Sequence, residues 1–173
     1  MKKDNWILKA FLMTFFIALI FSSASNYLIS KFNNTILLIV LCVIFIGIGI
    51  LFDIIGTAVL TANEASFHAK SAKKIKGSKE GVYLVKNSST IASICNDVIG
   101  DICGIVSGSI GAMLAINIST KLNVSTVIVT LLVSSIISSL TVGGKAIGKK
   151  QAIKNSDSII FVAAKVLSKF KTK

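Results

Sequence analysis

The sequence predicts an all-α integral membrane protein. Hydrophobic residues make up 53% of the 173 residues and the mean hydropathy is +0.82, above the apolar share of an ordinary soluble domain. The apolar residues are gathered in runs long enough to cross a bilayer, which takes about 20 residues of helix. All 19 basic residues are Lys, and they are concentrated in a few segments. In membrane proteins such positive charge collects on the cytoplasmic side. We expect a single membrane domain over 1–173 with four transmembrane helices.

The first two spans are predicted at 6–29 and 35–60. The first has Trp6 and Tyr27 at positions suited to the two membrane interfaces. It lacks a small-residue cleavage site followed by a soluble domain, so we interpret it as a span and not as a signal peptide. The second carries no charge before Asp53, which lies about 27 Å along the helix at 1.5 Å per residue. Asp53 is therefore expected near the cytoplasmic end of the hydrocarbon region.

A polar segment with six Lys, 62–86, is predicted to form a juxtamembrane helical hairpin in the cytoplasm. Its first helix is expected over 62–75, with Asn63 suited to an N-cap and Glu64 to the first turn. Its second helix is expected over 78–86. That helix is predicted to present an apolar face to the membrane, made up of Val82, Tyr83 and Val85.

Two further spans are predicted at 91–117 and 124–142. The third contains Asp97 and Asp101, which a helix places on one face a single turn apart. An ionised side chain at mid-membrane costs about 3 kcal/mol, so such residues usually face the interior of a helix bundle and serve a function there. The same face continues through three glycines that favour close helix packing, Gly104, Gly108 and Gly111.

The fourth span is expected to end at Gly143 and Gly144, where several Lys follow at once. A basic amphipathic helix is then predicted at 157–170, lying on the inner leaflet because anionic lipid attracts Lys. Its expected apolar face consists of Ile159, Ile160, Ala163, Val166, Leu167 and Phe170. Each outer loop holds one Lys and the remaining Lys fall inside, so we expect a multi-pass protein of the cell membrane with both termini in the cytoplasm.

This order of elements resembles the transmembrane part of the CorC/CNNM magnesium transporter family, over roughly Thr35 to Phe170. The first shared span of that family ends in a motif of the type Phe-Ser-x-x-Glu-Thr-Ala, and residues 52–58 here read Phe-Asp-Ile-Ile-Gly-Thr-Ala. The Gly-Asn pair of the family's next span has its nearest equivalent in Gly100-Asp101, preceded by Asn96-Asp97. The family's cytoplasmic nucleotide-binding regulatory domains have no counterpart in this sequence, so nucleotide regulation is not expected.

The resemblance implies transport of Mg²⁺, and the acidic residues fit that ion chemically. Mg²⁺ prefers hard oxygen ligands in octahedral geometry and keeps some of its waters, so a few carboxylate, amide and hydroxyl oxygens suffice. The candidate ligands are Asp53, Thr57, Asn96, Asp97 and Asp101. We expect a homodimer embedded in the lipid bilayer that captures a divalent cation from the cytoplasm. Proton relay and Na⁺ binding are further possible uses of the same carboxylates.

A different interpretation assigns these Asp residues a structural role. Carboxylates near the inner surface are hydrated, cap helices or pair with Lys, and the chain is then a non-transporting accessory or scaffold protein that docks a partner or anionic lipid through its basic cytoplasmic helices. The sequence contains no nucleophile-base pair and no phosphate-binding loop, which argues against an enzyme. Because no Arg is present, bidentate capture of phosphate is unavailable and nucleic acid binding is not expected.

Overall fold

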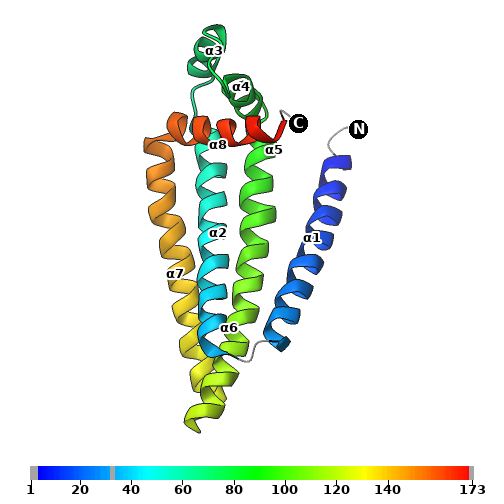
Figure 1. Cartoon of the computed structure of the whole chain (residues 1–173), viewed down its shortest axis with the longest axis vertical. Helices are drawn as coiled ribbons and strands as arrows, with labels where there is room; N and C mark the ends of the chain where they lie inside the picture. Colours follow the sequence, from blue (N-terminus) through cyan, green and yellow to red (C-terminus); the bar gives the residue numbers. More distant parts are fainter. Residues whose placement is uncertain (1–3, 32–33, 172–173) are drawn as a thin grey trace. The chain divides into compact units, whose positions relative to one another are not determined.

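The computed structural model describes residues 4–31 and 34–171, and no β-strand occurs in these two stretches (Figure 1). The predicted all-α class is therefore confirmed. The elements are α1 (Asp4–Lys31), α2 (Thr35–Thr61), α3 (Glu64–Ala72), α4 (Ser78–Lys86), α5 (Ser88–Ser93), a π-helix (Ile94–Gly100), α6 (Asp101–Leu122), α7 (Thr126–Lys154) and α8 (Ser156–Lys171). The chain divides into two compact units, Met1–Ile50 with Val98–Gly144, and Leu51–Asp97 with Lys145–Lys173.

Three helical stretches are long and apolar enough to cross a membrane. They are Thr35–Thr61, Ser88–Leu122 and Thr126–Lys154, at the places of the predicted spans 35–60, 91–117 and 124–142. The remaining predicted span, 6–29, lies within α1, whose apolar stretch among the described residues is the shorter Phe11–Ala24. The side chain of Trp6 lies outside the described part of the structure. A fourth span at α1 therefore stays a prediction.

The first unit is built on the contact between the first part of α2 and α6. Leu38 and Ile110 are almost fully buried in this core, which α1 and α7 extend with partly buried side chains. Gly111 brings α7 close to α6, because a methyl group there would collide with Ile137. At Gly104, by contrast, no described atom lies within 4 Å of the place a methyl group would take. The predicted close-packed glycine face is thus correct for only part of its length.

The fourth predicted span does not end at Gly143 and Gly144, as expected, because α7 continues to Lys154. Glycine inside a helix costs only about 1 kcal/mol relative to Ala, and the residues from 145 to 154 are mostly good helix formers. Gly144 serves packing, since a methyl group there would collide with the side chain of Ile50. The Lys residues that follow therefore lie on a continuous helix.

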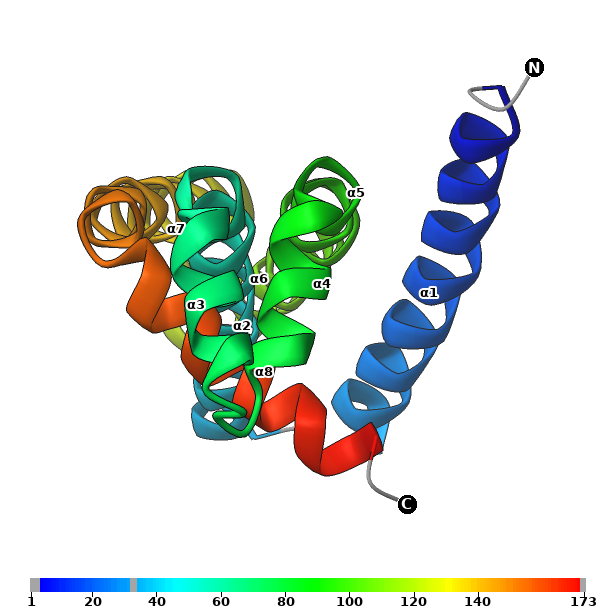
Figure 2. The ribbon, with the colours of Figure 1, turned by 90° about the horizontal axis from the view of Figure 1, so that it is seen from above.

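The second unit holds the predicted helical hairpin, α3 and α4, packed against α8 (Figure 2). Asn63 caps α3 as predicted, since its side-chain oxygen accepts a hydrogen bond from the Ala65 N–H at 3.0 Å. The helix is shorter than the expected 62–75. Phe67 is fully buried at the centre of the unit, against Gly81 of α4, where a methyl group would collide with its ring. The glycine therefore allows the two hairpin helices to lie close together.

The predicted apolar faces of α4 and α8 are partly wrong. Val85 is buried in the core of the unit instead of facing outward, whereas Tyr83 is exposed as expected. On α8 the side chain of Ile160 is fully buried in the same core, while Val162, absent from the predicted face, is exposed. The reason is that α8 buries one side against α4 and leaves the neighbouring side open, so it has two apolar faces.

The stretch before α6 is a π-helix of seven residues, Ile94–Gly100, and not the regular α-helix expected there. It contains Asn96 and Asp97, and Asp101 is the first residue of α6. Short π-helical turns inside α-helices are rare and are found frequently at functional sites. The change in helix type shifts the angular offset between Asp97 and Asp101 from the one that an ideal α-helix gives.

Candidate cation site

Asp53 is the buried carboxylate of the second unit, with 3% of the residue exposed. Two Lys of α7 approach it from one helix face, four residues apart. Lys145 Nζ lies 3.9 Å from Asp53 Oδ1, and Lys149 Nζ lies 3.7 Å from Oδ2. Both distances exceed the length of a hydrogen bond, so these are ion pairs without hydrogen-bonded contact. The carboxylate is compensated in charge and remains loosely held.

Two side-chain oxygen atoms of the second unit are buried without a hydrogen-bond partner in the described part of the chain. They are Asp53 Oδ2 and the amide oxygen Oδ1 of Asn96. Buried polar atoms are nearly always satisfied in folded proteins, so an unsatisfied pair calls for an explanation such as a bound ion. One of these two oxygens is anionic and the other is neutral, which is the kind of mixed set that a hard cation accepts.

Gly56 brings Asn96 to this site. A methyl group on Gly56 would collide with the amide oxygen of Asn96, so the π-helix approaches α2 at this glycine. Asp53 precedes Gly56 by three residues and therefore lies on the same face of α2, one turn away. Thr57, four residues after Asp53, shares that face and is half-buried. Asp53, Thr57 and Asn96 thus gather in one part of the second unit.

Asp97 and Asp101 differ from Asp53 in their surroundings. Both are exposed, and Asp101 belongs to the first unit. Among residues 4–31 and 34–171, no group of three or more His, Cys, Asp or Glu side chains could hold a metal ion. As ligands of one site with Asp53, Asp97 and Asp101 therefore stay a prediction. The candidate ligands that the second unit holds on or against one face of α2 are Asp53, Thr57 and Asn96.

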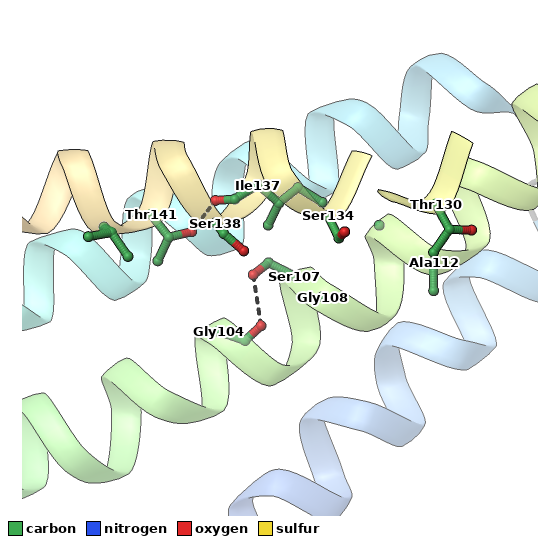
Figure 3. Close-up of a pocket in the computed structure, with 11 residues that line it drawn as sticks. Gly104, Ser107, Gly108, Ala112, Thr130, Ser134, Ile137, Ser138 and Thr141 are labelled. Carbon is green, nitrogen blue, oxygen red and sulfur yellow. Dashed lines mark hydrogen bonds between the residues drawn. The ribbon is translucent and has the colours of Figure 1, made fainter. Parts of the chain in front are cut away.

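A groove of about 310 Å³ lies between α6 and α7 in the first unit (Figure 3). Its lining is formed by small and hydroxyl-bearing residues, among them Gly104, Ser107, Gly108, Thr130, Ser134 and Ser138. Hydroxyls in this groove already donate to backbone carbonyls of their own helix, as Ser107 does to Gly104 at 3.0 Å and Ser134 to Leu131 at 3.1 Å. The lining contains no acidic residue. This groove is therefore suited to helix packing and provides no carboxylate ligand for a cation.

A second groove, of about 840 Å³, lies in the second unit between the Asp53 end of α2 and α8. Its walls are apolar, with Leu51 and Phe52 on α2 and Val162, Val166 and Phe170 on α8. Phe170 is 81% exposed. The polar side chains of its lining are those of Gln151, Asn155 and Ser158. The groove is therefore an exposed, mainly apolar surface.

In comparisons with known proteins, no protein-family model, no curated protein and no solved structure matches the chain. The similarity to CorC/CNNM transporters therefore stays a prediction from the motif residues. Sequence reasoning singled out Asp53, Thr57 and Asn96 but did not assign partners to Asp53. The signal that could have found them is the pair Lys145 and Lys149, spaced to lie on one face of α7.

Proposed function

We propose that the chain is a multi-pass protein of the cell membrane that binds and transports a divalent cation, Mg²⁺ by resemblance to CorC/CNNM transporters. This proposal is supported by two observations: Asp53 and Asn96 each hold a buried oxygen without a hydrogen bond, and Asn96 packs against Gly56, one helical turn from Asp53. Asp53 provides the charge, and Asn96 and Thr57 provide neutral oxygens. Because these are fewer than six ligands, the bound ion keeps several waters, which Mg²⁺ favours.

The membrane arrangement that goes with this function has four spans, with α1 as the first, and both termini in the cytoplasm. In that arrangement the Lys-rich end of α7 and the helices α3, α4 and α8 lie on the cytoplasmic side. Asp53 then faces the compartment from which the cation is captured. The open glycine positions of α6, Gly104 and Gly108, suit a close helix contact in a homodimer.

Thermal unfolding of the purified full-length chain in detergent tests cation binding directly. A ligand that binds only the folded state at ten times its Kd stabilises it by about 1.4 kcal/mol. For a chain of this size that raises Tm by about 3–6 °C. We expect MgCl₂ to produce a saturable rise that choline chloride of equal ionic strength does not.

Two variants and one control place the binding at the proposed site. Asp53→Asn and Asn96→Ala are expected to reduce or abolish the Mg²⁺-dependent rise. Asp157→Asn is the matched control, because it removes a carboxylate from the same unit while keeping an oxygen that can accept the hydrogen bond from Asn63 N. If folded wild-type protein shows no rise in Tm with Mg²⁺, Ca²⁺ or Mn²⁺, the proposal is refuted.

The second candidate function, an accessory protein that docks on anionic lipid, is favoured by the exposed apolar side of α8. Val162, Val166 and Phe170 are exposed there and line an apolar groove. Reconstitution into vesicles with and without phosphatidylglycerol tests it. A rise in Tm that requires the anionic lipid, is lost in Phe170→Ser and needs no divalent cation would favour docking over transport.

A further inference from the structure

Lys145 and Lys149 occupy the position around Asp53 that a bound cation would need. Their ammonium groups lie 3.9 Å and 3.7 Å from the two carboxylate oxygens. We propose that these two lysines are an internal counter-cation, which a divalent cation displaces when it binds Asp53. This inference rests on the proposed cation-binding function and assigns to it two residues that determine affinity and specificity.

The geometry of the ion pairs favours displacement. A tightly bound structural pair would show short, charge-assisted hydrogen bonds of about 2.7–2.9 Å, whereas both distances here are about 1 Å longer. Oδ2 also lacks a hydrogen bond in the described part of the chain. The Lys149 side chain is 51% exposed and that of Lys145 is 24% exposed, so both ammonium groups can turn toward water. The lysines therefore compensate the carboxylate without being fixed to it.

Charge and distance decide which cation replaces them. Coulomb energy scales with charge and inversely with distance. A Mg²⁺ ion approaches a carboxylate oxygen to about 2.0–2.1 Å, much closer than either ammonium. A monovalent ion brings half of that charge, and it competes with two ammonium groups already present. The lysines thus favour divalent over monovalent cations at Asp53.

Exchange at Asp53 also changes what holds α7. Lys145 and Lys149 lie on the terminal turns of α7 within the second unit, and their ion pairs join these turns to α2. A dication at Asp53 repels both ammonium groups, so the two helices lose this link when the cation binds. Occupation of the site by the cation is thereby coupled to release of the α7 terminus, through a difference in contacts between two states.

The test compares Mg²⁺ affinity, measured by isothermal titration calorimetry and by Tm titration, in wild type, Lys145→Met and Lys149→Met. Removing one partly exposed competing charge is expected to tighten binding about fivefold, the scale of a single exposed ion pair. Lys150→Met is the matched control, because Lys150 lies on the same helix, is exposed and is not one of the two lysines paired with Asp53. Its Mg²⁺ affinity should equal that of wild type.

A second prediction separates a displaced lysine from a purely structural one. Without Mg²⁺ each Met variant should have a lower Tm than wild type, because Asp53 loses part of its compensation. Saturating Mg²⁺ should remove this difference, because the cation replaces the missing charge. In wild type, acetylation of Lys149 relative to Lys150, followed by mass spectrometry, should increase when Mg²⁺ is added.

The outcomes distinguish failure of cation binding from failure of lysine displacement. If wild type and all variants ignore Mg²⁺, the proposed function fails and this inference with it. If wild type binds Mg²⁺ at Asp53 while both Met variants bind with unchanged or weaker affinity, the function stands and the internal counter-cation is refuted. Lys149 acetylation that is insensitive to Mg²⁺ in a wild-type protein that binds the ion refutes it as well, and this readout needs no variant to fold.

Discussion

Gly56→Ala is the substitution that most directly tests how the candidate site is built. The added methyl group would overlap the Asn96 amide oxygen and would lie 2.7 Å from its Cγ and 3.1 Å from its Nδ2. Overpacking of this kind costs about 1–3 kcal/mol. Replacing a mid-helix Gly by Ala returns roughly 0.5–1 kcal/mol. We therefore expect a net destabilisation of about 1–2 kcal/mol, or a fall in Tm of about 2–8 °C.

Gly47→Ala is the matched control for this experiment. It is the same change in the same helix, but no described atom lies within 4 Å of the new methyl group. Its Tm should stay level or rise slightly. The double variant Gly56→Ala with Asn96→Ala should regain most of the stability lost in Gly56→Ala, because the colliding amide is gone, with a coupling energy of about 1 kcal/mol or more.

Thermal unfolding in detergent, with and without Mg²⁺, gives both readouts from one series. Gly56→Ala should also weaken the response to Mg²⁺, because the amide oxygen of Asn96, a proposed ligand, is displaced from its position against Gly56. Two results would contradict this reasoning: an equal Tm for Gly56→Ala and Gly47→Ala, or no recovery of stability when the Asn96 amide is removed from Gly56→Ala. Either would show that Asn96 does not pack against Gly56, and Asn96 would then no longer be a candidate ligand.

Two further predictions concern the rest of the second unit. Phe67→Ala should destabilise the protein by about 3–5 kcal/mol because the ring is fully buried. Tyr83→Ala removes an exposed ring of the same hairpin and should change Tm little. Equal changes in Tm for the two variants would contradict the burial of Phe67. Asp157→Ala should cost about 1 kcal/mol, because the Asn63 N–H, which donates to Asp157 Oδ1 at 2.8 Å, loses its acceptor. Hydrogen exchange should then be faster at Asn63, and unchanged protection there would show that the bond contributes nothing.

Much of the fold could be predicted because its signals are local. Apolar runs with few charges define three stretches long enough to cross a membrane, and they lie where hydropathy indicates. The hairpin was predictable for the same reason, since Asn63 caps the helix that begins at the next residue. Both signals depend on residues close together in sequence, so the rest of the fold does not alter them.

The buried sides of α4 and α8 could not be fully predicted, because which side of an apolar helix is buried depends on the helix that packs against it. Ile160 and Val162 are both apolar and two residues apart, and only contact of α8 with α4 decides that the first is buried and the second exposed. The same holds for Val85, which was assigned to the membrane and belongs to the core of the second unit. The packing of Gly144 against Ile50 is likewise a contact between residues that are distant in sequence.

The candidate site was predictable in its residues and not in its contacts. Asp53 was conspicuous as the charge that interrupts an apolar run, and Asn96 as a polar neighbour of Asp97. Their grouping depends on Gly56, where two helices meet, and on lysines more than 90 residues further along the chain. The π-helix could not be predicted either, because the order of residues in 94–100 does not distinguish a π-helix from an α-helix.

Pairing with Lys and binding of a cation are not exclusive roles for Asp53, although the sequence presents them as alternatives. A buried carboxylate without compensation is strongly unfavourable, so a site formed by Asp53 alone would destabilise the cation-free protein by several kcal/mol. Lys145 and Lys149 reduce that penalty, and because they stay beyond hydrogen-bond distance they leave the oxygens available. A transport site must be stable both empty and loaded. Under the proposed function, two loosely paired lysines would stabilise the empty state, and their displacement would limit the affinity of the loaded state, which would favour release.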